Sequence, residues 1–159
     1  FFQLIYEKNV SYIFIGMESR KSYFDSRLTV VFLSERDAEY SKFTKHFKKL
    51  GLGFLWNNKI FIDVTRIENE GYTNDHMIFI ESHEVSHSWL KHPSKFDKKN
   101  EAEADFLGVL LCMKKGYKPA AKVGIRHFRE RNGIDFKKYD KKYGDEYRNM
   151  ISEQNKIRK

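Results

Sequence analysis

The chain has 159 residues, which suits a single domain over residues 1–159 whose core buries about two-thirds of the surface that the unfolded chain exposes. Its 40% hydrophobic and 16% aromatic content excludes an intrinsically disordered protein, and the single cysteine, Cys112, excludes an intrachain disulfide. No apolar run approaches the roughly 20 residues that span a membrane. With its lone cysteine the chain is expected in a reducing, cytoplasmic setting, and its net charge is +8.

The first third of the chain predicts a small sheet with one helix. Residues 3–16 favour one or two strands, and a charged loop over residues 18–26 follows them. Residues 28–33 are mostly apolar and β-branched, which predicts a buried strand. A capping-box-like start at Ser34 then predicts a helix over residues 35–50.

A hairpin is expected next, because Asn57 and Asn58 tolerate the positive φ angles of a tight turn. They separate two runs with strand character, residues 53–56 and residues 59–64. Residues 66–72 are expected to connect this hairpin to the following helix. The sequence thus predicts a small, mostly antiparallel sheet in the N-terminal part of the chain.

Residues 75–92 predict a helix with clear ends. Either Thr73 or Asn74 can cap its first turn, and Pro93 cannot continue it. No glycine or proline interrupts the segment. Four apolar side chains are expected to form its buried stripe: Met77, Ile78, Val85 and Trp89.

The clearest chemical signature lies in this helix, in the sequence His83-Glu84-Val85-Ser86-His87. Histidines four residues apart share one helical face, so two neutral imidazoles can supply two corners of a tetrahedral zinc site. Glu84 borders the same face and can reach a metal-bound water without binding the metal. A catalytic zinc ion needs a third protein ligand and one open position.

A second helix is expected over residues 100–115, closed by Gly116. Glu101 and Asp105 share one of its faces, so one carboxylate can complete the metal site while the other accepts the second ring N–H of a ligating histidine. The alternative for Glu101, Glu103 and Asp105 is a solvated acidic face, which the helix dipole favours. The expected packing stripe is Ala102, Phe106, Val109, Leu110 and Met113, and the small residues that allow close helix packing are Ala102, Ala104 and Gly108.

The two segments together resemble the gluzincin metallopeptidases, in which His-Glu-x-x-His precedes a helix with Glu-x-x-Ala-Asp. Residues 83–108, with His92 and the later Gly116-Tyr117-Lys118-Pro119, are similar to the HtpX and CaaX-prenyl-endopeptidase branch. The short format and the compact helix spacing are more similar to the ImmA/IrrE branch. The resemblance covers roughly residues 75–120. Ser86 stands where the family usually has glycine, and the membrane spans of the first branch are absent.

The resemblance implies an α+β, zincin-like fold in which the two helices pack together and bind one Zn²⁺ per chain. It implies that His83, His87 and Glu101 are the zinc ligands, with Glu103 the competing third ligand. By the same resemblance, Glu84 is the general base.

Residues around the expected ligands have candidate supporting roles, some implied by the resemblance and some by the chemistry of hydrolysis. Asp105 accepts the second ring N–H of a ligating histidine. Candidate donors to the oxyanion that forms during hydrolysis are His92, Tyr117 and His127. The strand beside the metal helix is a candidate substrate edge, which would hold a peptide as an added strand; an interior strand is the alternative. This candidate edge comprises Ile60, Phe61, Ile62, Asp63 and Val64.

Residues 117–159 predict a basic helical tail. Pro119 suits the first turn of a third helix that ends near Gly133, and a last amphipathic helix is expected from about Asp145 to the end. Tyrosines recur there every four residues and are expected to pack inward. They are Tyr139, Tyr143 and Tyr147.

The positive charge of the chain lies in this tail. Residues 114–159 contain 15 Lys and Arg against 6 Asp and Glu, a net +9, whereas residues 1–113 carry a net −1. Such asymmetry is typical of a surface that binds nucleic acid, an acidic partner or an anionic membrane, and equally of a lysine-rich solvated surface.

The predicted function is zinc-assisted hydrolysis of a peptide bond in a specific intracellular protein. Zinc lowers the pKa of its bound water to about 7, and Glu84 takes the water proton and delivers it to the leaving amine. Two alternatives remain. One is a zinc-binding regulator without proteolytic activity, and the other is a basic module that binds nucleic acid or protein.

Overall fold

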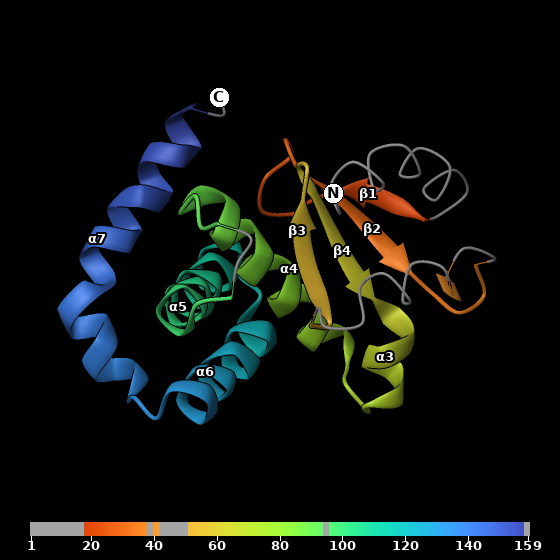
Figure 1. Cartoon of the computed structure of the whole chain (residues 1–159). Coiled ribbons are helices and arrows are strands. Elements are labelled where there is room, and N and C mark those ends of the chain that lie inside the picture. Colours follow the sequence, from red (N-terminus) through yellow and green to blue (C-terminus); the bar gives the residue numbers. More distant parts are fainter. Residues whose placement is uncertain (1–17, 38–39, 42–50, 94–95, 158–159) are drawn as a thin grey trace.

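A computed structural model describes residues 18–37, 40–41, 51–93 and 96–157 of the chain. These residues form an α+β structure with one four-stranded sheet and five helices, α3 to α7 (Figure 1). The strands predicted over residues 3–16 and most of the helix predicted over residues 35–50 lie outside the described residues.

The sheet is mixed and has the strand order β1-β2-β4-β3. Its strands are β1 (Ser19–Lys21), β2 (Thr29–Leu33), β3 (Gly53–Trp56) and β4 (Lys59–Asp63). β2 and β4 pair in parallel, and the two outer pairings are antiparallel. The predicted buried strand is therefore confirmed as β2. Residues 19–21, expected to lie in a loop, pair with β2 instead.

The hairpin between β3 and β4 is also confirmed. Asn57 and Asn58 have φ angles of 48° and 61°, the left-handed values that match a two-residue turn to the twist of its strands. Trp56 and Lys59 pair directly across this turn.

β4 is an interior strand, so the prediction that residues 60–64 form a substrate-binding edge is wrong. β4 pairs with β2 along one side and with β3 along the other. Its residues Ile60, Phe61 and Ile62 are fully buried, as expected for a strand that is covered on both faces. Phe61 belongs to a different hydrophobic cluster from its two neighbours.

Asp63 and Val64, the last two residues of the predicted edge, lie where β4 turns into helix α3 (Val64–Asn69). This helix replaces most of the connector expected over residues 66–72. The Asp63 carboxylate accepts a hydrogen bond from the backbone N–H of Arg66 (3.1 Å) and caps the helix. It also accepts a hydrogen bond from the Tyr40 hydroxyl at 2.8 Å.

Four longer helices follow: α4 (Asn74–Trp89), α5 (Lys98–Lys115), α6 (Lys118–Asn132) and α7 (Phe136–Ile157). α4 lies between the sheet and the other helices, in contact with β3 and β4 on one side and with α5 and α6 on the other (Figure 1). α7 lies outermost and packs against α5 and α6. α4 therefore connects the two layers of the structure.

Most helix ends agree with the predictions. Thr73 caps α4 as expected, and its N–H donates to Nδ1 of His76 at 3.2 Å. α4 ends at Trp89 rather than at residue 92, because Lys91 adopts a φ of 54° and turns the chain. Gly116 closes α5 in the left-handed conformation, as predicted.

α7 begins at Phe136, well before the expected start at Asp145. The Asp135 carboxylate accepts a hydrogen bond from the backbone N–H of Lys138 (3.1 Å), which stabilises an earlier first turn. Phe136 is buried and anchors that turn in the core. The preceding helix α6 ends at Asn132 and is capped by Gly133, as predicted.

The main core extends from the sheet through α4 to the outer helices. The inward packing predicted for the α7 tyrosines is confirmed for Tyr139 and Tyr147, whose ring centroids lie 4.7 and 5.2 Å from that of Phe106. Cys112 is fully buried, as expected. Met113 is 50% exposed, so its assignment to the packing stripe of α5 is wrong.

Candidate metal centre

Helices α4 and α5 approach closely where the predicted metal ligands lie. Gly108 of α5 allows this approach, because a Cβ atom there would lie only 3.1 Å from the backbone N of His83 and 3.3 Å from its Cα. Ala104, one turn earlier, is fully buried. The close packing predicted from small residues on α5 is therefore confirmed at these two positions.

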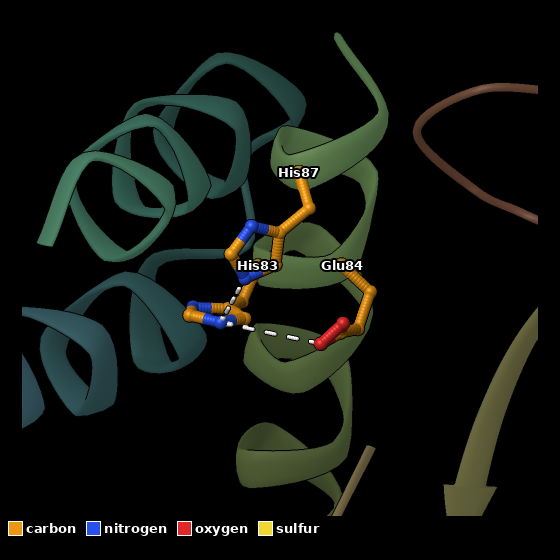
Figure 2. A group of neighbouring side chains, drawn as sticks. All are labelled: His83, Glu84 and His87. Atoms are coloured by element: carbon orange, nitrogen blue, oxygen red, sulfur yellow. Dashed lines mark hydrogen bonds and ion pairs between the residues drawn. The ribbon is translucent and has the colours of Figure 1, made fainter. Parts of the chain in front are cut away.

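His83 and His87 direct their Nε2 atoms toward the same point. Figure 2 shows both rings on one side of α4 with Glu84 beside them, and the two Nε2 atoms are 3.1 Å apart. One carboxylate oxygen of Glu101, from α5, lies 2.9 Å from Nε2 of His83. The other lies 3.3 Å from Nε2 of His87. The structure thus brings three of the predicted site residues together.

His83, Glu84 and His87 each offer a ligand atom, and these atoms lie within 4.8 Å of one another, so the group could hold a metal ion. The Glu84 carboxylate lies 4.0 Å from Nε2 of His83. The Glu101 carboxylate lies closer than that of Glu84 to Nε2 of His83, at 2.9 Å against 4.0 Å.

A buried carboxylate supports His83 from behind. Oδ1 of Asp105 lies 2.7 Å from Nδ1 of His83, as predicted for the second ring nitrogen of a ligand. Asp105 is fully buried, and within the described residues its Oδ2 has no hydrogen-bond partner. The half-exposed guanidinium of Arg131 lies 3.7 Å from Oδ1. Arg131 carries no sequence signal for this position, because it comes from α6.

The pKa values of this cluster reflect close pairing of histidines and carboxylates. Burial opposes the charged form of His83, but hydrogen bonds with Asp105 and Glu101 outweigh it and raise the pKa of His83 to about 10. Burial also opposes ionisation of Glu101, yet the hydrogen bonds with both imidazoles hold its pKa well below the ordinary value. Burial raises the pKa of Glu84, although both imidazoles act in the opposite direction.

The three candidate oxyanion donors lie in different surroundings. Nδ1 of His92 lies 2.9 Å from Nδ1 of His87, next to the proposed ligands. His127 stacks on Phe79 with ring centroids 5.8 Å apart. Tyr117 packs edge-on against Phe24 in the core, with centroids 5.7 Å apart. His92 is therefore the candidate that directly contacts a ligand.

A second buried carboxylate on α4, Glu81, is a feature that the sequence did not indicate. It is fully buried and accepts hydrogen bonds from the Arg20 guanidinium (2.6 Å), the Ser22 hydroxyl (2.7 Å) and the backbone N–H of Tyr23 (2.8 Å). These hydrogen bonds hold β1 and the following turn against α4. The partners lie about 60 residues away in the chain, so no local pattern could reveal them.

A pocket of about 560 Å³ opens beside β1, β2 and the N-terminal half of α4. Its lining includes Arg20, Tyr23, Phe32, Asn74 and Met77. None of the proposed ligands lines it, so it is separate from the candidate metal centre.

Within the described residues, no helix is long and apolar enough to cross a membrane.

Comparisons with known proteins found no relative of this chain. No protein-family model matches the chain, and it matches no curated protein and no solved structure.

Proposed function

We propose that the chain is a zinc-dependent endopeptidase that hydrolyses a peptide bond in a specific protein. The observation that carries the proposal is the convergence of His83, His87 and Glu101, whose nearest ligand atoms are 2.9 to 3.3 Å apart. Tetrahedral zinc with bonds of about 2.0–2.1 Å separates its ligand atoms by about 3.3 Å, which is close to the distance between the two imidazole nitrogens and to the distance from each of them to its nearer Glu101 oxygen. Three protein ligands leave one position open for chemistry.

The charges around the site also favour a cation. The carboxylates of Glu84, Glu101 and Asp105 gather against a buried helix pair, and Oδ2 of Asp105 has no hydrogen-bond partner among the described residues. In the metal-free chain, the raised pKa of His83 shows that this environment retains a proton. A divalent cation would supply the missing positive charge in place of that proton.

The neighbouring residues have distinct roles in the proposed reaction. Zinc, when bound, lowers the pKa of water to about 7 and polarises a carbonyl group. Glu84 lies beside the ligands without belonging to them, and it takes the proton of the attacking water and delivers it to the leaving amine. Its raised pKa suits this exchange. Asp105 holds the ring of His83 in the tautomer whose Nε2 binds metal.

Metal analysis of the purified protein and paired variants tests this proposal. We expect about one zinc per chain in the wild type, severe loss in Glu101→Ala, and near-normal stoichiometry in Glu103→Ala. The reverse pattern would assign the third ligand to Glu103. A wild-type protein that binds no divalent metal would refute the site.

A second experiment separates catalysis from metal binding. Glu84→Gln should retain zinc and lose cleavage of a peptide library by about 100-fold or more, because the general base is removed while the ligands remain. Undiminished cleavage by this variant would contradict the role of Glu84.

The exposed charge of α6 and α7 supports a second candidate, a metal-binding regulator that acts by binding an acidic partner or nucleic acid. Exposed lysines of these helices include Lys118, Lys122, Lys137, Lys138, Lys141 and Lys142. Biological activity that survives in Glu84→Gln would favour this candidate. DNA binding with a steep salt dependence would favour a nucleic-acid partner, because phosphate contacts release counterions.

A further inference from the structure

The early end of α4 brings a third histidine to the proposed metal site. A helix that continued to residue 92 would place His92 about 140° around the axis from His87. Instead, Lys91 adopts a positive φ of 54°, which non-glycine residues rarely do, and the backbone N–H of His92 donates to the carbonyl of His87 at 3.1 Å. This turn directs the ring of His92 toward that of His87.

A continuous set of polar contacts leads from His87 to the outermost helix. Nδ1 of His87 lies 2.9 Å from Nδ1 of His92. Nε2 of His92 lies 3.6 Å from Oε2 of Glu103 on α5. The same oxygen accepts a hydrogen bond from the hydroxyl of Tyr147 on α7 at 3.5 Å. The side chain of His92 is only 8% exposed, so water has little access to its ring nitrogens.

The protons along this set can be assigned from chemistry. Two ring nitrogens 2.9 Å apart need one donor and one acceptor. When Nε2 of His87 gives its lone pair to a cation, its proton must be on Nδ1, so His87 is the donor. Nδ1 of His92 then accepts, which leaves the proton of His92 on Nε2, facing the Glu103 carboxylate. Every N–H therefore points away from the metal.

The two proposed ligands thus have different supports. His83 donates directly to the carboxylate of Asp105. For His87, the imidazole of His92 lies between its ring and the carboxylate of Glu103. This arrangement also accounts for the presence of two glutamates near the start of α5, since Glu101 faces the ligands and Glu103 faces His92.

We infer that His92 and Glu103 are positioning residues that hold His87 in the tautomer and orientation needed to bind metal. The inference rests on the proposed metal site and adds the residues that tune it. It also assigns Tyr147 as the link through which α7 steadies Glu103. Glu103 on this assignment is not a ligand, which favours Glu101 as the third ligand.

Metal affinity of the full chain tests this inference. Zinc dissociation constants would be measured by competition with a chelator for the wild type, His92→Ala, His92→Asn and Glu103→Gln. His92→Ala should weaken binding by about 10- to 100-fold, the usual cost of losing such a partner. His92→Asn should recover most of this loss, because its side-chain oxygen can accept the same hydrogen bond. Glu103→Gln should weaken binding less than His92→Ala.

One control variant and two spectroscopic measurements separate positioning from general damage to the fold. Glu153→Gln removes a carboxylate from an exposed position on α7 and should leave zinc affinity unchanged. The visible spectrum of bound Co²⁺ should change in His92→Ala and return toward the wild-type spectrum in His92→Asn. In the zinc-loaded wild type, ¹⁵N chemical shifts of the imidazoles should place the proton of His92 on Nε2.

The outcomes distinguish this inference from the proposed function. A wild-type chain that binds no metal overturns both. Tight wild-type binding that His92→Ala leaves unchanged, in affinity and in Co²⁺ spectrum, overturns only the role of His92. A His92 tautomer with its proton on Nδ1 overturns that role independently of whether any variant folds.

Discussion

Replacing Gly108 by alanine tests how closely α4 and α5 approach beneath the proposed zinc site. The added methyl group would lie 3.1 Å from the backbone N of His83, 3.3 Å from its Cα and 3.1 Å from Oγ of Ser82. Non-bonded carbon atoms prefer about 3.5–4.0 Å, so the helices must separate by about 0.4 Å. Because two of these atoms belong to the backbone, α4 itself must move and carry His83 away from α5.

This shift is larger than a metal site tolerates. Ligand distances in metal sites hold to about 0.2 Å, so we expect zinc binding to weaken by about tenfold or more. Two opposing effects act on the metal-free protein. Alanine favours a helix over glycine by about 1 kcal/mol, whereas overpacking costs about 1–3 kcal/mol. The free energy of unfolding should fall by about 1 kcal/mol in Gly108→Ala.

Chelator competition measures the zinc affinity, and urea unfolding of the metal-free protein measures its stability. Gly144→Ala in α7 is the matched control, because the nearest atoms that its methyl group would meet belong to the partly exposed side chains of Asp140 and Arg148, which can move. The reasoning is refuted if Gly108→Ala binds zinc as tightly as the wild type and gains the about 1 kcal/mol that helix propensity alone supplies.

Three further predictions follow from the structure. Metal-free His83 retains a proton up to about pH 10, so zinc must displace that proton when it binds. The affinity of the chain for zinc should therefore rise by up to about tenfold per pH unit between about pH 6 and about pH 8. A zinc affinity that does not change with pH would contradict this. Arg20→Met should lower the free energy of unfolding by about 2 kcal/mol, because Glu81 stays buried without its cation. Arg148→Met removes an exposed ion pair and should lower it by at most about 1 kcal/mol. Equal losses in the two variants would contradict the larger contribution of the buried pair. Burial raises the pKa of Cys112 to about 12, so a thiol reagent should label it only as the chain unfolds, and rapid labelling of the folded protein would refute its burial.

The sequence predicted the features that depend on neighbouring residues. The ends of α5 and α6 follow from Gly116 and Gly133, and the hairpin follows from Asn57 and Asn58, because backbone conformation is a local property. The pairing of two histidines on one helical face is also local, so the two imidazoles of the candidate metal group could be recognised from spacing alone. The proposed third ligand, Glu101, lies on a second helix, and the small residues of that helix, including Gly108, predicted only that the two helices pack closely.

The features that the sequence did not reveal depend on distant parts of the chain. β4 became an interior strand because β2, about 30 residues earlier, pairs with it in parallel. No pattern within residues 60–64 specifies that partner. The position of His92 could not be predicted either, because it depends on a turn at Lys91, a residue that rarely has a positive φ.

The burial of α4 has a consequence for how this protein can evolve. The helix is covered by the sheet on one side and by α5 and α6 on the other, so a larger side chain at most of its positions would collide with one layer. The hydroxyls of Ser82 and Ser86 donate to carbonyls of α4 itself, at 2.8 Å each, and Oγ of Ser82 also accepts a hydrogen bond from the Cys112 thiol of α5 at 3.3 Å. A larger side chain in α4 therefore requires compensating changes in the sheet or in α5 and α6, whereas exposed positions of α7 can change without such compensation.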